Sequence, residues 1–92
     1  MIDEKHAVTL SNRAECFRLI GDYARAANDA TEASQVYPKY FKSYLRLGRI
    51  CEDLNDWLRA GHYYQIAFTM SNENKQIKMS LEKVNRRLRE ME

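Results

Sequence analysis

Two stretches of the chain, residues 7–40 and 41–74, carry the same pattern of apolar and polar positions. A shift of 34 residues superimposes one stretch on the other. The aligned pairs are Leu10 with Tyr44, Ala14 with Gly48, Ala26 with Ala60, and Ala33 with Ala67. A fixed period of this length is typical of a structural repeat. The sequence therefore predicts two copies of one supersecondary unit.

Each unit is predicted to contain two helices. The apolar positions of the first helix are Leu10, Ala14, Phe17 and Leu19. Their spacing predicts a helical stripe. A break follows at Gly21, and an alanine-rich second helix then runs to Pro38, which ends it. The second unit repeats this order, with breaks at Asn55 and near Ser71. The pattern predicts an all-α fold of antiparallel helix-turn-helix repeats.

Residues 75–92 predict a fifth helix. Its narrow apolar stripe consists of Ile77, Leu81, Val84, Leu88 and Met91. Ser71 or Asn72 is the expected N-cap. We expect this helix to cover the second repeat, with Leu81 and Leu88 buried near Tyr64. The alternative is the seam of a coiled-coil dimer, for which the stripe is short. A monomer and a single domain over residues 1–92 are expected.

The second unit resembles the tetratricopeptide repeat, whose pattern places aromatic residues, Leu-Gly and alanines at fixed positions. The matching residues are Tyr44, Leu47, Gly48, Ala60, Tyr64 and Ala67. It departs from the pattern at Cys51 and Asn72, and the first unit departs at Arg13. The opening "MIDEK" resembles the end of a preceding repeat. We therefore expect the domain to come from a longer array.

Charge and composition exclude several classes of protein. Fifteen cationic and 13 anionic side chains give a net charge of +2, which is too balanced for a typical nucleic-acid binder. No apolar run reaches the 18 or so residues of a membrane span, and the charged amino terminus is not a secretory signal. Cys16 and Cys51 form no disulfide framework and are expected to be buried thiols. A cytoplasmic protein that binds neither nucleic acid nor membrane is expected.

Catalytic chemistry finds no support in the sequence. His6 and His62 lie far apart and belong to no metal-binding motif, and the three glycines are isolated. Asp22 and Asp56 follow helix ends, so capping explains both. No nucleophile lies beside a base. We expect no catalytic residue, no metal site, no cofactor and no enzyme activity.

The resemblance implies a concave groove lined by the first helix of each unit. The groove positions are Val8, Ser11, Asn12 and Glu15 in the first unit, and Lys42, Leu45, Arg46 and Arg49 in the second. Lys42 and Arg46 are one helical turn apart, about 6 Å along the axis. Neighbouring helices pack roughly 8–10 Å apart, so we expect Asn12 to face Arg46. The gathered cations suit an acidic ligand.

These groove residues resemble one branch of the family, the co-chaperones that hold the acidic carboxyl-terminal tail of a heat-shock chaperone in a two-carboxylate clamp. The residues that carry this resemblance are Asn12, Arg13 and Ala14, followed by Lys42 and Arg46. The implied function is that of a protein-interaction adaptor. One alternative is a module attached to an enzyme, such as a prolyl isomerase, or to a J-domain protein. Another is a generic scaffold whose groove binds a helix of its partner.

Overall fold

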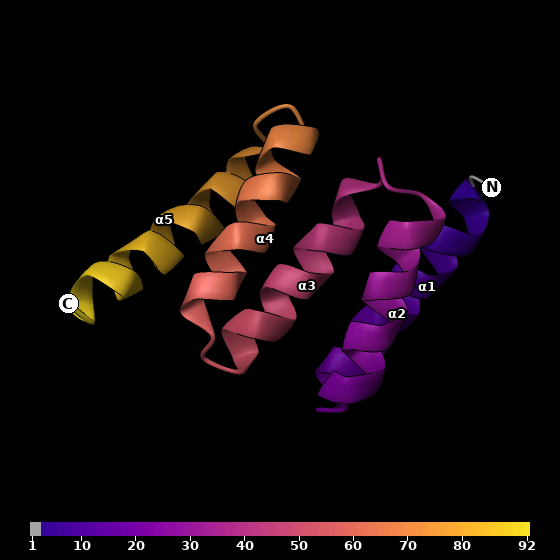
Figure 1. Ribbon diagram of the computed structural model, residues 1–92, viewed down its shortest axis with the longest axis horizontal. Helices are drawn as coiled ribbons and strands as arrows, with labels where there is room; N and C mark the ends of the chain where they lie inside the picture. The colour runs from indigo at the N-terminus through magenta and orange to yellow at the C-terminus, as the bar shows by residue number, and fades with distance from the viewer. Residues whose placement is uncertain (1–2) are drawn as a thin grey trace.

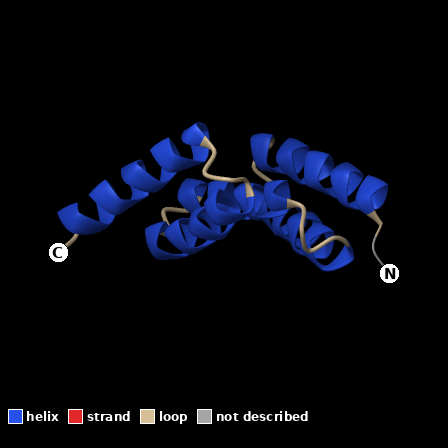
Figure 2. Ribbon diagram, turned by 90° about the horizontal axis from the view of Figure 1, so that it is seen from above, coloured by secondary structure: helices blue, strands red, loops and turns tan. Residues whose placement is uncertain are grey.

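The computed structural model describes residues 3–92, so Met1 and Ile2 of the opening segment lie outside the described residues. It contains α1 (Glu4–Leu19), α2 (Tyr23–Val36), α3 (Phe41–Asp53), α4 (Trp57–Met70) and α5 (Lys75–Glu90). Over this range every regular element is a helix, and no strand is present (Figure 2). The predicted all-α fold is confirmed. The first helix begins at Glu4, three residues before the predicted start of the first repeat.

The helices form a row of two antiparallel pairs and a final single helix. Helix α1 packs against α2, and α3 packs against α4. Helix α2 also contacts α3, α1 contacts α3, and α4 contacts α5. The described ends of the chain therefore lie at opposite ends of the array (Figure 1). The array measures 42 × 30 × 17 Å along its principal axes. This shape leaves α3 between the first pair and α5, where it can contribute to surfaces on both sides.

The two turns inside the repeats have equivalent structures. Gly21 has φ +82°, and Asn55, which follows it by 34 residues, has φ +60°. Glycine and asparagine are the residues that adopt this left-handed region most readily. Asp22 and Asp56 then cap α2 and α4, each accepting a hydrogen bond from the backbone N–H three residues later. The predicted breaks and the capping role of both aspartates are confirmed.

The turn before α5 is longer than predicted. Asn74 caps the helix by accepting hydrogen bonds from the backbone N–H groups of Gln76, at 2.9 Å, and Ile77, at 3.3 Å. The prediction of Ser71 or Asn72 as the cap was wrong. Asn72 and Glu73 both take positive φ angles, 56° and 63°, and carry the chain through one more bend before the helix starts.

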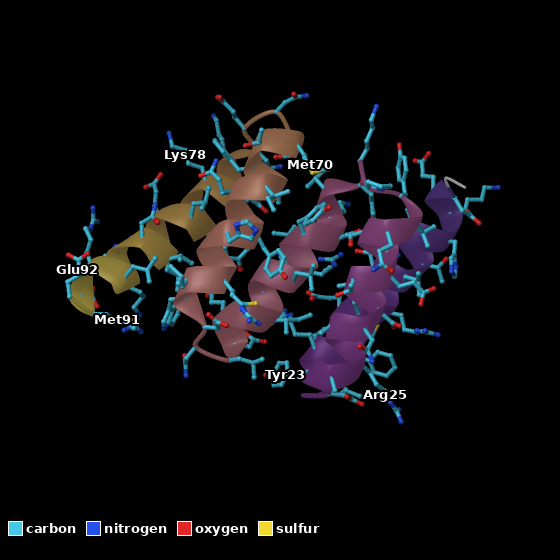
Figure 3. The ribbon with its side chains drawn as sticks, in the orientation of Figure 1. Tyr23, Arg25, Met70, Lys78, Met91 and Glu92 are labelled. Atoms are coloured by element: carbon cyan, nitrogen blue, oxygen red, sulfur yellow. The ribbon has the colours of Figure 1, made fainter. Side chains whose placement is uncertain are left out.

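Three predicted core positions lie at the surface instead. Leu19 is 69% exposed, because it follows Phe17 by two residues and so lies about 200° away around the helix. Cys16 is also exposed, whereas Cys51 is half-buried. Met91 is 67% exposed and lies at the far end of α5, beyond its contacts with α4 (Figure 3).

Helix α5 covers the second repeat. Ile77, Leu81 and Val84 are buried in one cluster with Tyr64 and Ala67 of α4. The prediction that Leu81 packs here is confirmed. Leu88 contacts the same cluster but is only half-buried, so it contributes less than predicted.

Candidate functional site

The cations of α3 line a pocket between α3 and α5. Lys42, Arg46 and Arg49 lie on one face of the helix, with spacings of four and three residues. The pocket has a volume of about 340 Å³. Its other lining residues are Phe41, Leu45, Asn74, Gln76, Ile77 and Ser80. The lining therefore contains three cations and no carboxylate, so it suits an anionic group.

Arg46 is the most deeply placed of these cations. Its Nε is buried and has no hydrogen-bond partner, and its guanidinium forms no ion pair within the described chain. Burial lowers the pKa of Arg46 from its ordinary value, because a charged group loses hydration there. A buried donor without a partner costs roughly 1–3 kcal/mol. An incoming carboxylate would neutralise a charge that the protein itself leaves unpaired.

Residues predicted from α1 are distributed differently. Asn12 is exposed on α1, and Val8 is half-buried near the start of the helix. Ser11 is fully buried, and its hydroxyl has no partner, so its side chain is not open to a ligand. No hydrogen bond joins Asn12 to Arg46 in the described residues. On α1, Asn12 is therefore the predicted polar residue that remains free for binding.

Glu15 places an acid in the predicted groove and engages the neighbouring cations. It accepts two hydrogen bonds from Arg18, at 2.8 and 3.1 Å, and one from Arg49 at 3.3 Å. Arg18 also donates to Asp53 at 2.8 Å, which connects α1 to α3. These hydrogen bonds, led by those from Arg18, hold the pKa of Glu15 below its usual value. Arg49 is thus partly neutralised, whereas Lys42 and Arg46 have no acidic partner.

The contribution of α5 to the pocket was not predicted. Gln76 and Ser80 follow Lys42 and Arg46 by 34 residues, so the repeat period continues into α5. Sequence analysis treated this helix only as a cover for the second repeat. Extending the 34-residue alignment by one further unit would have placed Gln76 and Ser80 beside the pocket.

Other kinds of site are not supported by the described residues. Within residues 3–92, no group of three histidine, cysteine or acidic side chains is arranged to hold a metal ion. No helix in this range has the length and apolar character needed to cross a membrane. The polar features of the molecule are therefore concentrated on the faces of α1, α3 and α5.

Comparison with known proteins identifies relatives among the heat-shock proteins. The chain is 34% identical over 79 residues to "Heat shock protein STI1" of Saccharomyces cerevisiae, which covers 86% of this chain and 13% of that protein. The chain spans between 13% and 21% of the length of the curated relatives that it matches. No family model matches it.

Solved structures with the same fold support this relationship. The Sgt2 TPR domain from Aspergillus fumigatus superposes with a TM-score of 0.85 and 32% identity, over 92% of this chain and 58% of that one. The second TPR domain of human RPAP3, solved with the HSP70 peptide SGPTIEEVD, gives a TM-score of 0.79 and 26% identity, over 87% and 67%. The 34-residue period, the stacked helix pairs and these likenesses agree, and the chain belongs to the tetratricopeptide-repeat family.

Proposed function

We propose that this domain is an adaptor that binds the acidic carboxyl-terminal tail of a heat-shock chaperone. The observation that carries the proposal is the unpaired Arg46, which lies beside Lys42 on a surface without a neighbouring acid to neutralise either residue. Asn12, exposed on α1, completes the proposed contact set. The ligand would lie across the faces of α1 and α3.

The chemistry of such a tail matches these groups. A terminal aspartate presents two carboxylates, and hydrogen bonds from lysine or arginine to a carboxylate contribute roughly 1.5–3 kcal/mol each. The peptide bound by the RPAP3 domain ends in Glu-Glu-Val-Asp. Asn12 can donate its amide to the main chain or to a carboxylate of an extended peptide. Because ordering a flexible peptide costs free energy, we expect a dissociation constant in the micromolar range.

The proposal also sets the character of the domain. It would act by binding alone, without catalysis, as a monomer in the cytoplasm, and it would bind neither nucleic acid nor membrane. Arg49 and Glu15 would border the site as an ion pair at 3.3 Å rather than contact the terminal carboxylates. Leu45 and Val8, both half-buried, would contact small apolar side chains of the peptide.

Calorimetric titration with SGPTIEEVD tests the proposal. Arg46→Glu and Lys42→Glu should each abolish measurable binding, because attraction becomes repulsion at the contact. Amidating the peptide terminus should weaken binding about tenfold or more by removing one carboxylate. Added salt should weaken it as well, since exposed charges are screened.

Arg59→Glu is the matched control. Arg59 is a 76% exposed side chain on α4, and it lines a different pocket together with Leu58 and His62. Its reversal changes the net charge equally and should leave the affinity within about twofold, because exposed charges beyond a Debye length of about 8–10 Å are largely screened. Equal affinity for the free and amidated peptides would overturn the proposal, as would the absence of wild-type binding at millimolar peptide.

A further inference from the structure

The pocket between α3 and α5 offers anion-binding features on the side of α3 that faces away from α1. Its lining brings the amide of Gln76 and the hydroxyl of Ser80 to the same pocket as Lys42, Arg46 and Arg49. The side chains of Phe41, Leu45 and Ile77 form its apolar part. A pocket of this composition suits a carboxylate carried on a short aliphatic stem, which is the side chain of glutamate.

The start of α5 adds to the positive potential of this pocket. Asn74, Gln76 and Ile77 belong to the cap and first turn of a helix of 16 residues. The amino-terminal end of a helix carries a partial positive charge and favours anions. Independently, Arg46 lines the pocket with a buried Nε that has no partner. The helix end and the unpaired guanidinium thus favour the same kind of ligand.

The opposite side of α3 differs in charge. There Glu15 of α1 accepts hydrogen bonds from Arg18 and Arg49, so an acid of the protein already occupies part of that surface. No acidic residue lines the α3–α5 pocket. A ligand with several carboxylates is therefore repelled less on the α5 side as it extends beyond Lys42 and Arg46.

We propose that the α3–α5 pocket binds a glutamate side chain of the same acidic tail, upstream of its terminal residue, with Ser80 and Gln76 donating hydrogen bonds to it. This inference rests on the proposed function. Adjacent helices lie about 8–10 Å apart, and an extended peptide advances about 3.3 Å per residue, so the two sites are about three residues apart. In SGPTIEEVD, the residue three positions before the terminal aspartate is the first glutamate.

Introducing an acid into the pocket tests the assignment by calorimetry. Ser80→Glu should weaken binding of SGPTIEEVD by about tenfold, because the new carboxylate competes for the pocket and repels the ligand. The peptide SGPTIQEVD, which lacks the first glutamate charge, should bind the wild type more weakly and lose little more with Ser80→Glu. Ser80→Ala should give a smaller loss, about twofold to threefold, through one missing donor.

Thr69→Glu provides the control, because it exchanges a hydroxyl for a carboxylate at an exposed position of α4 outside the pocket. Circular dichroism confirms that each variant is folded. Equal penalties for both peptides, or none for either, would overturn the subsite even if Arg46→Glu still abolished binding. Loss of the Arg46 effect would instead overturn the proposed function, so the two failures are distinguishable.

Discussion

The two repeats reach the same fold with side chains of different sizes. In the first, Ala14 packs in a cluster with Ala26 and Ala30. In the second, the residues 34 positions later are Gly48 and Tyr64, and the tyrosine ring lies 2.7 Å from the place where a Cβ on Gly48 would be. The larger side chain on one helix is thus matched by a missing one on its partner. Core volume is conserved across a helix pair rather than at each position.

A second difference concerns polarity. Arg13 donates two hydrogen bonds to Asp29, at 2.6 and 2.9 Å, and Asp29 is only 6% exposed. The equivalent residues of the second repeat are Leu47 and Tyr63, which belong to an apolar cluster. An ion pair with a buried carboxylate often stabilises a fold no more than apolar residues of similar volume. We therefore expect the first repeat to be the less stable of the two.

The largest effect is expected in the cluster that joins the second repeat to α5. Leu81→Ala removes a side chain that is 8% exposed and should lower the free energy of unfolding by about 2–4 kcal/mol. Leu88→Ala should cost less, because Leu88 is half-buried. Urea denaturation measures both, with Leu19→Ala at an exposed position as the control, where we expect about 0.5 kcal/mol or less. Equal losses at Leu81 and Leu19 would mean that α5 does not stabilise the repeat.

Gly48→Ala tests whether volume is shared between the paired helices. Its Cβ would meet the buried Tyr64 ring, and overpacking of this kind costs about 1–3 kcal/mol. In a Tyr64→Leu background the same substitution should cost less or become stabilising, since alanine favours helix over glycine by about 1 kcal/mol. A double-mutant cycle measured by thermal denaturation gives the coupling. Additive effects would show that the two positions are independent.

Exchanging the ion pair for its apolar equivalent tests the difference in polarity. Arg13→Leu alone should cost about 1–3 kcal/mol, because it leaves the carboxylate of Asp29 buried without a donor. The double variant Arg13→Leu, Asp29→Tyr reproduces the pair found in the second repeat and should recover most of that loss. Chemical denaturation of the three variants checks this. A double variant less stable than Arg13→Leu would show that the first repeat cannot accept the apolar pair.

The smallest effect concerns pH and the charges that connect α1 to α3. Hydrogen bonds from Arg18 hold the pKa of Glu15 below its ordinary 4.5 in the folded protein. Glu15 therefore stabilises the fold above that pH, and its contribution disappears as the pH falls through the lowered value. Glu15→Gln should cost about 1 kcal/mol or less at pH 7. The difference from wild type should vanish below about pH 4, as measured by urea denaturation at several pH values.

Local signals in the sequence were sufficient for most of the fold. Gly21, Asn55 and the aspartates that follow the two turns act within one turn, so their roles could be predicted from neighbouring residues alone. The exposure of Leu19 could also have been derived, because a helical period places it away from Phe17. The cap of α5 was missed, since Asn72 and Glu73 take positive φ angles that nothing nearby in the sequence indicates.

The candidate site depends more on contacts between distant residues. That Lys42 and Arg46 share one face follows from their spacing in a helix. The partners of Arg49 and Arg13 lie on other helices, and their pairing with Glu15 and Asp29 depends on how closely those helices approach. Burial of Ser11 has the same origin. Such contacts are fixed by packing, which a period in the sequence does not specify.

The exposure of Cys16 has a practical consequence for fluorescence measurements. Its thiol is open to solvent, whereas burial raises the pKa of the half-buried Cys51 and keeps less of it in the reactive thiolate form. A thiol-directed dye should therefore attach first at Cys16, next to Glu15 in the sequence. The natural chain thus provides its own position for a reporter on α1, without any engineered cysteine.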